Sequence, residues 1–257
     1  MKILRKITER LSRGKVIKRK ITVSGNTVSI FVSPDAQLKY LKLGSRAFDQ
    51  DLIRIAEENL NENSNVWDVG ANVGVFTFAA SSVAHKGVVL AIEADIWLAS
   101  IIRKTTNLEE HLNKNIHVLP AAISNSNSVA SFMVAKRGRA SNALETAGGR
   151  SEMGGVREKQ YVPTLTLDTL LDTFPAPEFI KIDVEGAEYM VLQGATNIIN
   201  NVRPQFYIEV GSDVSDKILA LFESAGYVAF DPLGNQLKGH CAPNTFFFPE
   251  EKVVVSQ

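Results

Sequence analysis

The sequence predicts a doubly wound α/β fold, in which helices cover both faces of a mostly parallel, seven-stranded sheet. Short and nearly all-apolar runs alternate with stretches of helical spacing, which is typical of a parallel sheet buried on both sides. The last two strand candidates have no helix between them, so we expect a C-terminal antiparallel hairpin. The 257 residues, 45% of them apolar, suffice for one such domain and a short appendage.

The expected elements follow one another along the chain. A Ser-Gly-Asn turn signal at 24–26 predicts a small hairpin at 21–32, and acids in the first turn favour a helix at 49–60. Strands are expected at 66–69, 88–93, 116–119, 179–184, 205–210, 227–230 and 245–248. Helices are expected at 76–82, 98–112, 165–174, 187–199 and 215–225, and a long loop at 136–160. We divide the chain into a basic arm with the hairpin, residues 1–45, and a main domain, residues 46–257.

Charge is spread unevenly although the net charge is zero. Residues 1–20 hold nine Lys or Arg against one acid, so the remaining residues carry a net charge of −8. Such a body is not expected to bind nucleic acid. The arm has a crude apolar stripe, Ile3, Ile7 and Leu11, and is either a solubilising terminus or a peripheral contact to an anionic membrane.

Cysteine content and hydropathy bear on the cellular compartment in which we expect the protein. Cys241 is the only cysteine, which excludes an internal disulfide and a cysteine zinc cluster. No apolar run approaches the roughly 18 residues that a membrane span needs, and the start lacks the apolar centre of a secretory signal. We therefore expect a cytoplasmic protein.

The most informative segment is Asp68-Val69-Gly70-Ala71-Asn72-Val73-Gly74, where a strand turns into a helix. Gly70 and Gly74 permit a tight turn and close approach of a ligand to the backbone, and Asn72 tolerates positive φ. Asp68 would repel the phosphates of a dinucleotide. The acid instead suits S-adenosylmethionine, which carries an ammonium and a sulfonium.

A second acid follows at the end of the next strand. Glu93 lies 25 residues after Asp68, a spacing that suits one helix and two loops, and it would hold the ribose hydroxyls. Either acid alone is explained by ordinary structure, but both at neighbouring strand ends predict a cofactor site. Its residues are Asp68, Gly70, Asn72, Gly74 and Glu93. A parallel sheet closed by an antiparallel hairpin is the architecture of class I methyltransferases.

Four segments resemble the FkbM family of methyltransferases. They are the loop at 68–74, Pro-Thr-Leu-Thr-Leu-Asp-Thr-Leu at 163–170, Phe-Ile-Lys-Ile-Asp-Val-Glu-Gly-Ala-Glu at 179–188 and Pro-Asn-Thr-Phe-Phe-Phe-Pro at 243–249. The similarity covers about residues 45–250. The family commonly has proline after the second-strand acid, whereas Ala94 follows Glu93 here. The resemblance implies methyl transfer from S-adenosylmethionine, usually to a hydroxyl of a sugar or natural product.

Asp183 and Glu185 are the candidate catalytic residues. Asp183 lies near the carboxyl end of a strand and is placed to take the proton of an acceptor hydroxyl. Glu185 either assists it or stabilises the start of the next helix. Glu209 ends the neighbouring strand, where Asp183 and Glu209 together would hold Mg²⁺; alternatively, Glu209 pairs with a basic side chain or caps a helix.

The acceptor side is less clearly marked. Ser141 and Asn142 resemble a polar element of the family that would contact a sugar, or they belong to an ordinary polar loop. None of the four histidines has the spacing of a ligand or catalytic residue. The leading hypothesis is an S-adenosylmethionine-dependent O-methyltransferase with a small-molecule or glycan acceptor. The alternatives are an inactive binding module with the same fold, or an NAD-dependent oxidoreductase.

Overall fold

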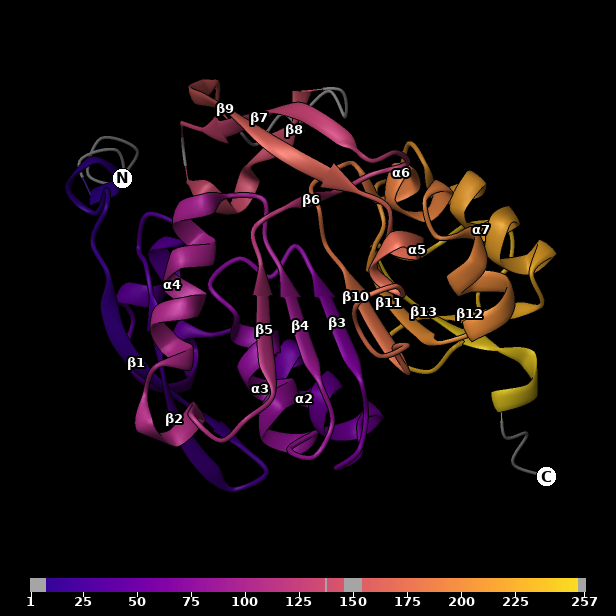
Figure 1. Cartoon of the computed structure of the whole chain (residues 1–257), viewed down its shortest axis with the longest axis horizontal. Coiled ribbons are helices and arrows are strands. Elements are labelled where there is room, and N and C mark those ends of the chain that lie inside the picture. The colour runs from indigo at the N-terminus through magenta and orange to yellow at the C-terminus, as the bar shows by residue number, and fades with distance from the viewer. Residues whose placement is uncertain (1–7, 137, 146–153, 254–257) are drawn as a thin grey trace.

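The computed structural model describes residues 8–136, 138–145 and 154–253. Its centre is a seven-stranded sheet in the order β12-β13-β11-β10-β3-β4-β5 (Figure 1). The strands are β3 (Val66–Val69), β4 (Val89–Ile92), β5 (Ile116–Leu119), β10 (Phe179–Ile182), β11 (Gln205–Glu209), β12 (Tyr227–Phe230) and β13 (Asn244–Pro249).

Strand directions confirm the predicted sheet. The neighbours from β11 to β5 are parallel, whereas β13 runs antiparallel to both β11 and β12 and lies between them. This is the fold of class I methyltransferases. Since all parallel strands share one direction, the loops after β3, β4, β10 and β11 meet at one edge of the sheet.

Helices bury both faces of the sheet, which explains why its strands are almost wholly apolar. On one face lie α2 (Gln50–Asn59), α3 (Val75–Val83) and α4 (Ile96–Thr106). On the other lie α5 (Leu167–Leu170), α6 (Glu188–Gln193), a π-helical turn (Ile198–Val202) and α7 (Ser215–Ser224). Within β3, Val66 packs with the first group and Trp67 with the second.

Three expected helices are shorter than predicted. The helix expected at 98–112 begins at Ile96, where Asp95 caps it, and ends at Thr106. The one expected at 165–174 is reduced to α5, because Leu165 still belongs to a strand. The one expected at 187–199 is interrupted at Gly194, where an added Cβ would lie 2.3 Å from the carbonyl oxygen of Ser124.

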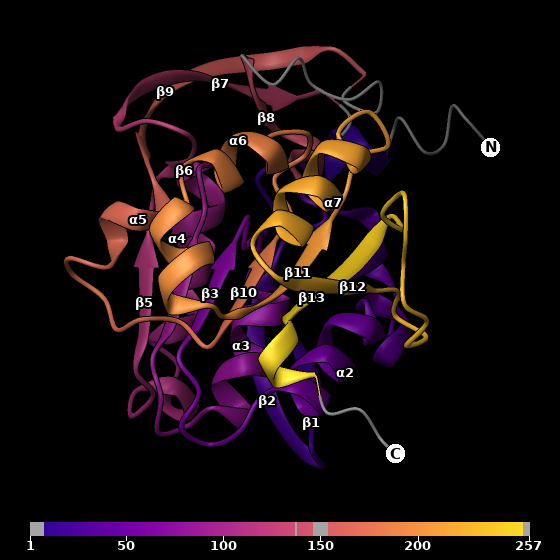
Figure 2. The ribbon, with the colours of Figure 1, turned by 90° about the vertical axis from the view of Figure 1, so that its right-hand side faces the viewer.

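A second sheet covers the carboxyl ends of the main strands (Figures 1 and 2). It has the order β6-β9-β7-β8, formed by β6 (Ala122–Ile123), β7 (Ser128–Ala135), β8 (Ala143–Leu144) and β9 (Val156–Leu165). The prediction of a long loop at 136–160 is therefore partly wrong, because residues 156–160 belong to β9. Arg137, Gly148 and Gly149 of that expected loop lie outside the described residues.

The predicted N-terminal hairpin is present as β1 (Ile17–Val23) and β2 (Asn26–Val32), joined by Ser24 and Gly25 at positive φ. Ile21 and Ile30 pack into the same core as α2, α3 and α4. The boundary between residues 45 and 46 stays a prediction. Of the arm's apolar stripe, Ile3 and Ile7 fall outside the described residues. No helix in the described part is long and apolar enough to cross a membrane.

Candidate functional site

The loop after β3 has the backbone that its sequence predicts. Gly70, Asn72 and Gly74 have φ of 77°, 56° and 85°, and Gly74 is the N-cap residue of α3. The Gly70 and Ala71 amides both donate to the carbonyl oxygen of Ile92, 3.0 Å away. A Cβ on Gly70 would lie 1.8 Å from the carbonyl oxygen of Asp183, so only glycine fits between the ends of β3 and β10.

Lys181 lies beneath this loop and is almost fully buried. Its Nζ is 3.2 Å from Asp68 Oδ1, 3.6 Å from Asp183 Oδ2, and donates to the Gly70 carbonyl oxygen at 3.1 Å. Burial disfavours the charged amine, but the nearby carboxylates, Asp68 first, outweigh it and raise the pKa of Lys181. The side chain is therefore a fixed ammonium group.

Asp68 lies under the loop and lines neither of the two hollows described below. It is fully buried, and its Oδ2 accepts a hydrogen bond of 2.6 Å from the Thr77 hydroxyl. Its contacts in the structure are therefore Thr77 and Lys181. The predicted contact between Asp68 and a cofactor stays a prediction.

Glu93 lies where the prediction put it, at the end of β4 beside the loop. Its Oε2 accepts from the Asn72 amide at 2.7 Å, and its Oε1 accepts from the Asp95 amide at 2.8 Å. Burial raises the pKa of Glu93 to about 8, although the two amide hydrogen bonds oppose this.

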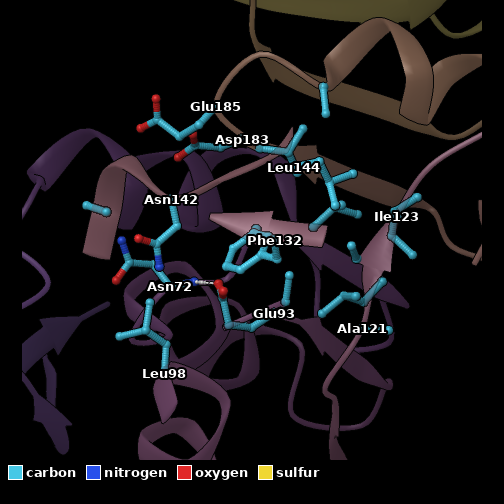
Figure 3. Close-up of a pocket in the computed structure, with 18 of the residues that line it drawn as sticks. Asn72, Glu93, Leu98, Ala121, Ile123, Phe132, Asn142, Leu144, Asp183 and Glu185 are labelled. Carbon is cyan, nitrogen blue, oxygen red and sulfur yellow. Dashed lines mark hydrogen bonds between the residues drawn. The ribbon is translucent and has the colours of Figure 1, made fainter. Parts of the chain in front are cut away.

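An inner pocket opens over Glu93 and Asn72, and Figure 3 shows its residues. Its walls include apolar side chains from five elements, β4, α4, β6, β7 and β8: Ile92, Leu98, Ile123, Phe132 and Leu144. Asn72 brings a buried side-chain oxygen that has no hydrogen-bond partner among the described residues. The pocket thus combines apolar walls with a carboxyl group and an amide at one end.

An outer cavity of about 190 Å³ lies on the other side of the loop. Its lining is polar and includes Lys39, Tyr40, Asp49, Asp51, Lys181, Tyr207, Glu209 and Asn244. Gly70, Asn72, Ala140, Asp183 and Glu185 line both the pocket and the cavity. Asp183 and Glu185 therefore stand at the junction, and Glu185 adopts positive φ there.

Of the two residues predicted to contact the acceptor, Asn142 lines the inner pocket and Ser141 does not. Asn142 lines the inner pocket, but its amide is committed: Nδ2 donates to Asp95 Oδ2 at 2.7 Å, and Oδ1 accepts from the Ala135 amide at 2.8 Å. Ser141 lines neither the pocket nor the cavity. These two bonds hold Asn142 in the roof of the pocket, and the predicted contact of Ser141 and Asn142 with an acceptor stays a prediction.

An ionic network fixes this roof. Arg139 donates to Asp95, lies 3.4 Å from Asp35 Oδ2, and stacks over the Trp97 ring with its guanidinium carbon 4.7 Å from the centroid. Arg157 also pairs with Asp35, at 3.0 Å. The network joins the segment after β2, the start of α4 and the small sheet.

Comparison with known proteins identifies the family. The profile described as "Methyltransferase FkbM domain" matches residues 68–229. The chain belongs to the FkbM family of methyltransferases. The predicted membership is confirmed, over a narrower stretch than the predicted 45–250.

Individual relatives are more distant. The hexuronic acid methyltransferase AglP of Haloferax volcanii is 28% identical over 182 residues, covering 68% of this chain and 69% of AglP. Methyltransferase FkbM from Methylobacillus flagellatus is 16% identical, with a TM-score of 0.47, covering 84% of this chain and 58% of that one. The T. thermophilus 16S rRNA methyltransferase RsmC, solved with AdoMet and guanosine, is 10% identical with a TM-score of 0.48, covering 91% and 50%. The chain thus spans 58% and 50% of the length of these two solved structures.

The predicted magnesium site gains no support. Among the described residues, no group of three or more His, Cys, Asp or Glu side chains is arranged to hold a metal ion. Asp183 and Glu209 both line the outer cavity, but the ammonium group of Lys181 already supplies a positive charge 3.6 Å from Asp183. The positive charge between the ends of β3 and β10 is therefore the ammonium group of Lys181.

Several residues of this FkbM-family site were missed from sequence. Lys181 interrupts an apolar strand, and such a charge in a buried run is a usable signal. Asp95 precedes a helix and has the residue type of an N-cap. Arg139 and Asp35 carry no local signal, because they are 104 residues apart.

We expect Gly70→Ala to destabilise the fold by more than about 2 kcal/mol, because the methyl group overlaps the Asp183 carbonyl. Gly234→Ala is the matched control: its φ is 84°, but no atom lies within 4 Å of the added Cβ. That change should cost only about 1 kcal/mol for the backbone conformation. Urea denaturation measures both, and equal losses would show that the contact with Asp183 is unimportant.

Glu93 should make stability depend on pH. Between its ordinary pKa of 4.5 and its folded value of about 8, the folded state retains a proton that the unfolded state has lost. Stability from this group therefore falls as pH rises through that window, by at most about 1.4 kcal/mol per pH unit.

Urea denaturation at a series of pH values, for wild type and Glu93→Gln, measures this effect. The stability of wild type relative to the variant should fall as pH rises. Glu58→Gln, an equivalent change at an exposed position on α2, should follow the wild-type pH profile. If stability changed with pH equally in wild type and Glu93→Gln, the result would contradict the raised pKa of Glu93.

Proposed function

We propose that this protein transfers a methyl group from S-adenosylmethionine to a hydroxyl of a sugar or related small molecule. The observation that carries the proposal is the pair of hollows that meet at Asn72, Asp183 and Glu185. One hollow has several apolar walls and the Glu93 carboxyl, and the other is more polar. The methyl donor would occupy the first hollow and the acceptor the second, and the two would meet at Asn72, Asp183 and Glu185.

The inner pocket fits the adenosyl part of the donor. Its apolar walls suit a purine ring, and Glu93 has carboxyl oxygens that accept hydrogen bonds from ribose hydroxyls. The unpartnered side-chain oxygen of Asn72 supports a polar ligand group at this position, because such an atom is costly to leave unsatisfied. Asp183, which also lines this pocket, gives a carboxylate for the charged methionyl part.

Asp183 is the proposed general base. When bound, S-adenosylmethionine supplies a methyl group on a sulfonium, which an acceptor oxygen can attack while the carbon–sulfur bond breaks. Asp183 is 35% exposed at the junction, whereas its neighbour Lys181 is buried. Its carboxylate takes the acceptor's proton as the new carbon–oxygen bond forms. Glu185, which lines both hollows, would orient the acceptor by hydrogen bonding.

The polar lining of the outer cavity supports a polyhydroxylated acceptor. The carboxylates and side-chain amides in this lining can bond the hydroxyls of such an acceptor. The relative named for hexuronic acid points to the same class of acceptor. Membership of a methyltransferase family argues against the oxidoreductase alternative.

Binding of S-adenosylhomocysteine tests the donor part of the proposal. Calorimetry should detect binding to wild type, and Glu93→Gln should weaken it by about tenfold or more, because one of two acceptor oxygens is lost. Glu62→Gln, at an exposed ion pair, is the control and should bind as wild type. If wild type did not bind S-adenosylhomocysteine, the result would contradict the proposed function.

Asp183→Asn should leave S-adenosylhomocysteine affinity nearly intact while lowering methyl transfer by roughly a hundredfold or more. The assay uses a labelled methyl donor and a panel of hexosides and glycans. Asp172→Asn, at an exposed turn away from the site, should remain fully active. Equal activity of Asp183→Asn and wild type would exclude the general-base role. Binding without any methylated product would favour the inactive binding module.

A further inference from the structure

The segment Leu41-Lys42-Leu43-Gly44-Ser45-Arg46, here called the lip, lies on the surface directly after residues that line the outer cavity. All six residues are exposed, including Leu41 at 46% and Leu43 at 81%. Single exposed leucines are common on protein surfaces, but two on one short segment between basic residues are unusual. The lip therefore presents apolar and cationic groups together.

The lip is fixed at its base. Tyr40 and Phe48 flank it, are buried, and contact each other with ring centroids 5.9 Å apart. Arg19 of β1 donates to the Tyr40 carbonyl oxygen at 3.1 Å, which ties the lip to the basic N-terminal region. Packed residues thus anchor the lip on both sides, and its two leucines stay exposed.

The lip adjoins the site through the residues that precede it. Gln37, Lys39 and Tyr40 line the outer cavity, and Lys39 and Tyr40 belong to the short 3₁₀ helix Leu38–Leu41. A surface that touches Leu41 and Leu43 would therefore lie next to the cavity.

The charges near the lip favour an anionic surface. No hydrogen bond or ion pair of the Lys42 or Arg46 side chain occurs among the described residues. The nearby acids at the start of α2 are already matched: Asp49 lies 4.0 Å from Lys39, and Asp51 lies 2.8 Å from Arg54. Because residues 21–257 carry a net charge of −8, an anionic surface would repel most of the body but not this segment.

We propose that the lip inserts Leu41 and Leu43 into the interfacial region of an anionic lipid membrane, with Lys42 and Arg46 at the headgroups. Two leucines and two cations give weak, reversible adsorption. This contact places the outer cavity beside the membrane, where it would receive an acceptor carried on a lipid. That consequence rests on the proposed function, whereas the membrane contact itself does not.

Vesicle co-sedimentation of the full chain tests the contact. The probes are vesicles of phosphatidylcholine alone and vesicles with about one third phosphatidylglycerol, at near-physiological salt. Wild type should adsorb to the anionic vesicles only. Leu41→Ser with Leu43→Ser should lower the partition coefficient by about tenfold, because two apolar side chains no longer enter the interface. Lys42→Gln with Arg46→Gln should have a similar effect.

Leu233→Ser is the matched control, because Leu233 is 86% exposed but lies on a turn beside Asp231. It should adsorb as wild type. Wild-type adsorption by the double leucine variant would overturn the proposal and leave the basic arm as the contact. Failure of wild type to adsorb would also overturn it, leaving a protein partner for the lip. Calorimetry with S-adenosylhomocysteine on the same samples reports the proposed function separately.

Discussion

The buried ammonium group of Lys181 is the constraint on which the geometry of the site depends. A buried charge is tolerated only where opposite charges and hydrogen-bond acceptors surround it, and removing one partner leaves an uncompensated charge. Lys181 meets this requirement through Asp68 on β3, Asp183 after β10 and the Gly70 carbonyl. The ends of two neighbouring strands are therefore locked to the loop between them. The two ends also pack so closely that a Cβ on Gly70 would lie 1.8 Å from the Asp183 carbonyl oxygen, so no side chain fits between them.

Sequence reasoning succeeded where the signal is local. The strands of the main sheet are short apolar runs, and their placement needs only their periodicity and the intervening helices. The turn at Asn72 was predictable because few residues other than glycine tolerate positive φ. Glu93 and Asp183 reached the same edge of the sheet because parallel strands align their carboxyl ends. Their proximity follows from topology once the strand order is known.

Sequence reasoning did not reveal partners that are distant in the chain. It did not show that the Asn142 amide bonds to Asp95 and to the backbone of β7. It also did not show that Lys181 and Thr77 contact the Asp68 carboxylate. The predicted ligand contacts of both residues stay predictions. A polar side chain has the same appearance in a sequence whether a ligand or a distant residue binds it. The small sheet was missed for another reason. The last four residues of β7 are all buried, so the strand shows no alternation of buried and exposed side chains.

The small sheet is part of the site because one residue joins it to the inner pocket. Asp95 caps α4 through Oδ1, which accepts from the Trp97 and Leu98 amides, while its Oδ2 accepts from Arg139 and Asn142 in the roof. Its own amide donates to Glu93. The roof therefore cannot shift without disturbing the start of α4 or the hydrogen bonds of Glu93. Because Glu93 also binds the Asn72 amide, the connection continues to the loop above Lys181. The roof, the carboxyl of Glu93 and the junction at Asp183 thus hold one another in place, although they come from segments far apart in the chain.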